Sequence, residues 1–308
     1  MDILVSGSMA YDRIMNFSGQ FSDHILPDQL DNINVSFAVD SLTEHIGGTA
    51  GNIAYSLSLL GEKPRILATM GRDYHRYFEW LHKCGISTDD IRIVEDELTA
   101  GAYITTDLNS NQFTGFNPGA MKHQAGFSYA GVDASDTIAI VGPGNLADMM
   151  EFTAKNSELG IYSIFDPGQS LPIWEPEALS RCIGQSNALI CNEYELGMIV
   201  NSTGLSREKL VGMVEHLVVT LGAEGAEFHS RGTSGRVPVV STDAVDPTGA
   251  GDAFRGGLIK GLAHGAGIER AVQMGTICGH YAVRVSGTQT YRYTQAEYEA
   301  KLRDCFGE

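Results

Sequence analysis

The stretch that decides the fold is DPTGAGDAF, at residues 246–254. Its small residues let the backbone curl tightly and turn several N–H groups toward one point. The apolar pattern over 252–263 predicts a helix, whose positive N-terminal end would strengthen the same point. Gly249, Ala250 and Gly251 therefore predict a cradle for a phosphoryl group in transfer.

Asp252 falls in the first turn of this predicted helix, where a carboxylate can face the cradle. A carboxylate in that position can accept the proton of an attacking hydroxyl group. An acidic residue in a first helical turn is also a common feature without chemistry. The complete nine-residue string favours a catalytic base over that alternative.

The string is similar to the second signature of the ribokinase-like, or PfkB-type, carbohydrate and nucleoside kinases. The first signature of that family resembles GGTAGN at residues 47–52, which leads into a helical pattern. The resemblance implies that Asp252 is the catalytic base and that Gly249, Ala250 and Gly251 form the anion hole. It also implies an ATP-dependent phosphotransferase built as a three-layer α/β/α sandwich with a small β-sheet lid.

Two motifs near the N-terminus predict the binding of the acceptor. Gly47 and Gly48 allow the backbone to approach a sugar closely, and Asn52 offers both a donor and an acceptor to a hydroxyl. Asp12, in the segment GSMAYD at 7–12, resembles the Asp that binds sugar hydroxyls in these kinases. A plain turn would explain each motif taken alone. Their order along the chain favours binding.

Two further motifs predict the ATP site. Asn192 and Glu195 match the Asn-x-x-Glu element of the family, which resembles an element that organises Mg²⁺ through water. Acidic residues also begin many helices without any chemical role. Thr220, Gly222 and Gly225 lie in a glycine-rich turn similar to the nucleotide-binding turn of the family. A Walker A string is absent, so a P-loop enzyme is excluded.

The resemblance implies a potassium-like ion beside the anion hole, held by Asp243 with Val245 and by residues 283–287. Members of the family differ in their dependence on such an ion. The segment FDPGQ, at 165–169, contains no arginine where many relatives have one. This difference disfavours a sugar-phosphate acceptor, whose anion needs such a charge. It also leaves open which group stabilises the charge of the phosphoryl group in transfer.

Short apolar runs alternate with helical patterns, which predicts an α/β layered fold with a mostly parallel sheet. The predicted strands are 3–5, 65–68, 137–141, 162–165, 188–190 and 216–220, and the helical patterns include 52–60, 74–84, 206–215 and 252–263. We expect one kinase domain over 1–308. Residues 11–45 and 97–118 break the rhythm, and we interpret them as the lid, although an ordinary surface hairpin would also explain the second region.

Aromatic residues in the second lid region bear on the acceptor. Phe113 and Phe116 could cover the face of a purine, because aromatic side chains stack on any base, or they could simply pack the lid. The segments QFTGFNPGAM at 112–121 and SGTQTY at 286–291 resemble the bacterial and archaeal adenosine kinase branch. We therefore expect phosphorylation of the 5′-hydroxyl of adenosine or a related purine nucleoside, with ATP and Mg²⁺.

Two rival functions stay open at this point. A sugar kinase acting on a ribose-like or fructose-like acceptor would use the same catalytic parts. A non-catalytic nucleotide-binding regulator could share the fold, since fold alone does not establish chemistry. A Rossmann oxidoreductase is excluded, because no GxGxxG follows the first predicted strand with an acidic residue about twenty positions later.

Composition restricts the partners of the chain. Its 308 residues are 43% hydrophobic, enough for one large core, and its formal charge of −17 argues against binding of nucleic acid. No apolar run approaches the roughly 18 residues that span a bilayer. The five cysteines are scattered without metal-binding spacing, so we expect reduced thiols and a cytoplasmic protein. Monomer and homodimer are both compatible with the sequence.

Overall fold

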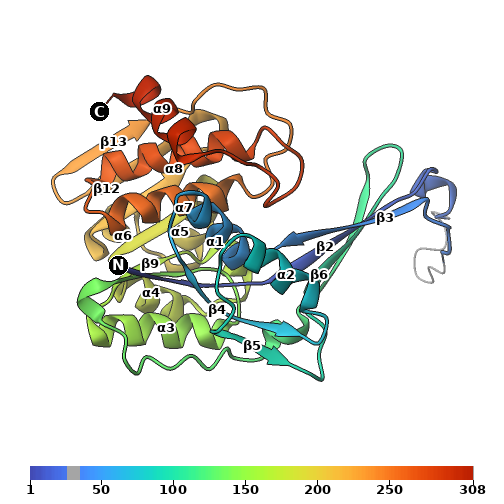
Figure 1. The fold of residues 1–308 in the computed structure, drawn as a ribbon, viewed down its shortest axis with the longest axis horizontal. Helices are drawn as coiled ribbons and strands as arrows, with labels where there is room; N and C mark the ends of the chain where they lie inside the picture. The colour runs from blue at the N-terminus through green and yellow to red at the C-terminus, as the bar shows by residue number, and fades with distance from the viewer. Residues whose placement is uncertain (26–34, 308) are drawn as a thin grey trace.

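A nine-stranded sheet forms the centre of the protein in the computed structural model, which describes residues 1–25 and 35–307 (Figure 1). The strand order is β13-β12-β11-β10-β9-β8-β1-β4-β5, and only the pairs that involve β12 and β13 are antiparallel. The strands are β1 (Asp2–Ser6), β4 (Arg65–Gly71), β5 (Ile91–Val94), β8 (Thr137–Val141), β9 (Tyr162–Phe165), β10 (Ala188–Asn192), β11 (His216–Thr220), β12 (Ala226–Ser230) and β13 (Thr233–Val237). The mostly parallel sheet is as predicted.

Helices cover both faces of this sheet. Because successive strand residues point to opposite faces, Ile3 and Val5 join one buried cluster and Leu4 joins the other. One face carries α1 (Thr49–Leu59), α2 (His75–Lys83), α7 (Ala250–Ala263) and α8 (Ile268–Ala282); the other carries α3 (Leu146–Leu159), α4 (Pro176–Gly184), α5 (Glu193–Thr203) and α6 (Arg207–Met213). A last helix, α9 (Gln295–Phe306), packs on α8. The predicted α/β/α sandwich is confirmed.

A second, four-stranded sheet extends away from the main body (Figure 1). Its order is β3-β2-β6-β7, from the strands β2 (Ala10–Asn16), β3 (Ser41–Gly47), β6 (Ala100–Thr106) and β7 (Gln112–Asn117). Both regions predicted to form the lid contribute strands to this small sheet. Residues 26–34 of the first region lie outside the described residues. An isolated surface hairpin is excluded, because β6 also pairs with β2 along its whole length.

The predicted strands and helices agree with the structure to within a few residues at their ends. Over the described residues, every helix is too short or too polar to cross a membrane. The chain passes from β1 to β2 through a three-residue connection, residues 7–9, so the first strand of the main sheet leads directly into the small sheet. This connection brings the N-terminal sequence motif to the boundary between the two sheets.

Candidate active site

The N-terminal turn of α7 forms the predicted cradle. Gly249 precedes the helix with φ 76°, a left-handed conformation that favours glycine, and a Cβ atom there would meet the Thr288 methyl group at 2.8 Å. No side chain caps this helix. The first N–H groups of an α-helix lack partners within the helix, so those of Gly251 and Asp252 are available to an anion.

Asp252 lies at the edge of this turn, and its carboxylate is positioned by Asn52. The amide Nδ2 of Asn52 donates to Oδ2 of Asp252 at 2.8 Å. Burial raises the pKa of Asp252 to about 6, while nearby Arg255 and the Asn52 hydrogen bond act in the opposite direction. A carboxyl group with this pKa is ionised near neutral pH yet retains more affinity for a proton than a surface aspartate, as general base catalysis requires.

Arg255 reaches this site from the next turn of α7. Its Nε and Nη2 donate to the two carboxylate oxygens of Asp166, the latter at 2.8 Å, and its Nη1 donates to the Gly251 carbonyl at 3.0 Å. Both side chains of the ion pair are buried. Burial acts to lower the pKa of Arg255, but Asp166 outweighs it and the pKa is raised. An arginine therefore does meet the FDPGQ segment, although it comes from elsewhere in the chain.

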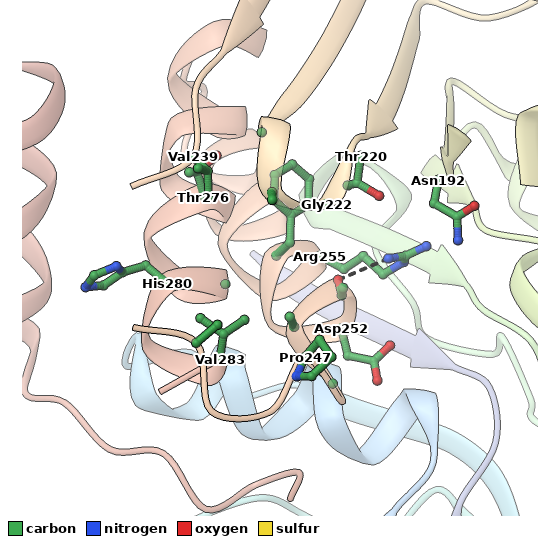
Figure 2. Close-up of a pocket in the computed structure, with 18 of the residues that line it drawn as sticks. Asn192, Thr220, Gly222, Val239, Pro247, Asp252, Arg255, Thr276, His280 and Val283 are labelled. Atoms are coloured by element: carbon green, nitrogen blue, oxygen red, sulfur yellow. Dashed lines mark hydrogen bonds between the residues drawn. The ribbon is translucent and has the colours of Figure 1, made fainter. Parts of the chain in front are cut away.

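A cavity of about 750 Å³ lies in front of α7, a size that suits a nucleotide. The residues predicted to bind ATP all line it: Asn192, Glu195, Thr220, Gly222 and Gly225. Asp252 and Arg255 also line this cavity. Figure 2 shows both leaving α7, with the Arg255 side chain extending toward the side of Asn192 and Thr220. The ATP motifs and the cradle thus share one cavity.

Asn192 and Glu195 form a capping box at the start of α5. The Asn192 N–H donates to Oε2 of Glu195 at 2.7 Å, and the Glu195 N–H donates to Oδ1 of Asn192 at 2.8 Å. The structural role of an Asn-x-x-Glu motif is therefore present here. Burial also raises the pKa of Glu195, with Asp166 adding to the effect. Asp166, Glu195 and Asp252 line the cavity, but over the described residues no cluster of three such side chains could hold a metal ion directly, so binding of Mg²⁺ stays a prediction.

Asn52, predicted as a ligand of an acceptor hydroxyl, already makes hydrogen bonds within the protein. Its side chain is buried, with Nδ2 bonded to Asp252 and Oδ1 accepting from Gln289 at 2.9 Å. Both polar ends are thus engaged inside the protein. Gly48, with φ 90°, has no room for a Cβ atom, which would lie 2.6 Å from the Ser8 carbonyl. Binding of a sugar by these residues stays a prediction.

Asp12 lies on β2 in the small sheet, beside Gly47. Burial raises its pKa, while His45 acts to lower it. Asp12 and Asp252 both act on Tyr77 electrostatically, so the two carboxylates approach the same buried side chain from different elements. The main cavity is lined by Asp252 but not by Asp12 or Gly47. Asp12 and Gly47 therefore lie next to each other outside the nucleotide cavity.

Phe113 and Phe116 lie on opposite faces of the small sheet, because they are three residues apart on β7. Phe116 pairs with Ala102, which pairs with Asp12, so Phe116 and Asp12 share a face. Phe113 packs on Phe21, with ring centroids 4.6 Å apart, in an aromatic cluster on the other face. Of these two rings, that of Phe116 therefore lies on the same face of the small sheet as Asp12.

Comparison with known proteins identifies the family. The model of the pfkB family carbohydrate kinases matches residues 4–295, which is nearly the whole chain. The chain belongs to this family. As a pfkB-family member it is an ATP-dependent kinase that acts on a hydroxyl acceptor, and the expected ribokinase-like fold is confirmed.

Relatives of this pfkB-family kinase match along most of their length. The nucleoside kinase of Methanothermobacter thermautotrophicus is 30% identical over 297 residues, 94% of this chain and 91% of that protein. The structure of Burkholderia thailandensis nucleoside kinase in complex with inosine is 39% identical, with a TM-score of 0.86, and the match covers 99% of this chain and 98% of that one. The complex of that enzyme with ADP-inosine is 40% identical, with a TM-score of 0.84, and covers 99% and 96%.

The segments predicted to hold a monovalent ion in this pfkB-family kinase do meet. The N–H groups of Val245 and Asp246 both donate to the Val283 carbonyl, at 2.7 and 3.1 Å. That carbonyl is consequently engaged, and the Val245 side chain is exposed. Asp246 also accepts from the Gly287 N–H at 2.8 Å. Ion binding by Asp243 and Val245 stays a prediction.

Sequence reasoning missed one wall of the nucleotide cavity. This wall comes from the segment after β13 and from α8, and its residues include Val239, Val240, Thr276, Gly279, His280 and Val283. Figure 2 shows Val239, Thr276, His280 and Val283 along this side. No motif marks these residues for nucleotide binding, and Val283 was predicted only as part of the ion-binding segment 283–287. Their only signal is position, since α8 packs closely on α7.

Proposed function

We propose that this pfkB-family kinase transfers the γ-phosphoryl group of ATP to the 5′-hydroxyl of a purine nucleoside, with adenosine as the expected acceptor. The observation that carries the proposal is the common face of Asp12 and Phe116 on the small sheet. A carboxylate for ribose hydroxyls then stands beside an aromatic ring for the base. The similar nucleoside kinase whose structure contains inosine supports a purine nucleoside and makes inosine the first alternative acceptor.

Different residues bind the nucleoside, accept the proton and stabilise the transferred phosphoryl group. Asp12 binds ribose hydroxyls, Phe116 covers the base, and Asp252 accepts the proton of the 5′-hydroxyl as its oxygen attacks phosphorus. The N–H groups before and within the first turn of α7 bind the oxygens of the transferred group. Arg255 places positive charge beside them, at 3.0 Å from the Gly251 carbonyl. Mg²⁺, held near Glu195 largely through water, would neutralise phosphate charge.

We infer that the reaction returns purine nucleosides to the monophosphate pool in the cytoplasm, where the five free thiols stay reduced. The direct test is release of ADP from Mg-ATP with adenosine, inosine, guanosine, cytidine, ribose, fructose and fructose 6-phosphate as acceptors. Turnover on purine nucleosides supports the proposal. Turnover on a free sugar alone would contradict the nucleoside acceptor but would leave the proposed role of Asp252 intact. No turnover on any acceptor in the panel would contradict kinase activity on nucleosides and sugars.

Phe116→Ala is expected to raise the KM for the nucleoside about tenfold or more, since stacking of one base on an aromatic ring contributes roughly 1–3 kcal/mol. The KM for ATP should stay within about twofold, because Phe116 lies on the small sheet. Phe113→Ala is the matched control: it removes the same ring, equally exposed, from the opposite face. Steady-state kinetics of both variants check this. An equal effect of the two substitutions would contradict the stacking role of Phe116.

A further inference from the structure

Gln289 has an unusual backbone conformation for its residue type. Its φ is 55°, in the left-handed region, and among the described residues Ser110 is the only other non-glycine residue with a positive φ. Its side chain is 3% exposed. Such a conformation is unfavourable for most residues with a side chain, so it persists only where surrounding contacts enforce it. The buried contacts of the Gln289 side chain therefore hold its backbone in this conformation.

The Gln289 amide uses both ends in buried hydrogen bonds. Its Oε1 accepts from the indole Nε1 of Trp80 at 2.8 Å. Its Nε2 donates to Oδ1 of Asn52 at 2.9 Å and to the Tyr77 hydroxyl at 3.0 Å. Asn52 in turn donates to Asp252. A continuous chain of hydrogen bonds thus runs from Trp80 on α2 to the carboxylate on α7.

The chemistry of Trp80 determines the direction of this chain. An indole N–H can only donate, so it must face the oxygen of the Gln289 amide. The amide nitrogen of Gln289 then faces Asn52, which must present its oxygen there and its own nitrogen to Asp252. Without this constraint the Asn52 amide could rotate and place its oxygen against the carboxylate, where two acceptors repel each other.

We propose that Gln289, oriented by Trp80, is a positioning residue that keeps the Asn52 amide donating to Asp252. The proposal rests on the function of Asp252 as the base. A fixed donor favours the ionised carboxylate and aims its free oxygen toward the acceptor hydroxyl. Trp80, Gln289 and Asn52 do not line the nucleotide cavity, whereas Asp252 does. The Tyr77 hydroxyl, which accepts from Gln289, donates to the Gly47 carbonyl at 2.7 Å, so the titration of Asp252 is the readout that isolates the effect on the carboxylate.

The loop around Gln289 has independent attachments. The Thr288 hydroxyl donates to the Ile46 carbonyl at 2.6 Å, and the Gly287 N–H donates to Asp246 at 2.8 Å. The Tyr55 hydroxyl donates to the Tyr291 carbonyl at 2.6 Å. Changes at the Gln289 side chain therefore leave the loop attached on both sides. Asn also tolerates left-handed backbone better than most residues, so Gln289→Asn keeps the conformation while shortening the amide by one methylene.

Substitution of Gln289 or Trp80 leaves the other charged groups around Asp252 in place. They are Arg255 on the same helix, Asp166 after β9 and Glu195 on α5, with Asp12 acting from the small sheet on the shared neighbour Tyr77. None of them bonds to Gln289 or Trp80. A change in the titration of Asp252 upon substitution of either residue therefore reports the orientation of Asn52.

The experiment measures kcat/KM for the nucleoside against pH in Gln289→Asn, Trp80→Phe and wild type, after thermal unfolding confirms that each is folded. Loss of the fixed donor destabilises the ionised carboxylate, so the acidic limb should move to higher pH, by about half a unit or more in Gln289→Asn. Trp80→Phe should move it in the same direction by less. Activity in Gln289→Asn should fall about twofold or more at pH 6 and much less at pH 7, where most of Asp252 stays ionised, with the KM for ATP unchanged.

Tyr55→Phe is the matched control, because it removes a buried hydrogen bond to the same loop and keeps the ring that stacks on Trp80. Its acidic limb should coincide with that of wild type. An unchanged limb in both Gln289→Asn and Trp80→Phe overturns the proposal, as does an equal shift in Tyr55→Phe, which would indicate general loosening of the loop. Failure of the base itself is distinguishable, since Asp252→Asn would then retain turnover.

Discussion

Asp252→Asn is expected to lower kcat roughly a hundredfold to ten-thousandfold, the range that general base catalysis contributes. The amide has nearly the same shape as the carboxylate but cannot accept the proton of the hydroxyl. Binding of nucleoside and ATP should persist, because the cavity and the small sheet are unchanged. Steady-state kinetics and calorimetric binding measurements with the same preparation separate the two effects.

The pH dependence of wild-type activity is a second test of Asp252 as the base. With a pKa of about 6, Asp252 is ionised above that pH, so activity should be present at neutral pH and lost as the pH falls through about 6. Asp304→Asn, an exposed carboxylate on α9, is the control and should keep full turnover. Turnover of Asp252→Asn within tenfold of wild type would exclude the proposed base.

Arg255→Met is expected to lower the free energy of unfolding by about 3–5 kcal/mol, because it leaves the carboxylate of Asp166 buried without its partner. Urea unfolding followed by circular dichroism measures this change. The double variant Arg255→Met, Asp166→Asn should be more stable than Arg255→Met alone, since it contains no unpaired buried charge. A loss below about 1 kcal/mol in the single variant, typical of surface ion pairs, would contradict the burial of this pair.

Local sequence was sufficient to predict six strands of the main sheet, although β5, β12 and β13 were not predicted. Runs such as 137–141, TIAIV, are rich in β-branched and apolar residues, which suits a strand buried on both faces, and the structure places this run in the main sheet. The strands in residues 97–118 were also predictable, because the alternating pattern there differs from that of the core strands. The opposite faces of Phe113 and Phe116 follow from their spacing of three, once the strand itself is established.

Contacts between segments far apart in the sequence could not be predicted. Arg255 and Asp166 are separated by 89 positions, and Asn52 and Gln289 by 237. The arginine did leave a signal: it stands in the apolar stretch of α7, where a buried charge requires a partner. Neither the identity of that partner nor the direction of the Asn52 amide could be derived, because both depend on which elements pack together.

The strand order has a consequence for synthesis of the chain on the ribosome. From β8 to β13 the strands lie side by side in the order in which they are made, so the sheet can extend by one strand at a time. Helix α7, with Asp252 and Arg255, emerges after all of them, and Gln289 later still. A nascent chain that already folds its earlier strands therefore lacks its base, and cannot transfer phosphate from ATP before residue 252 has been made.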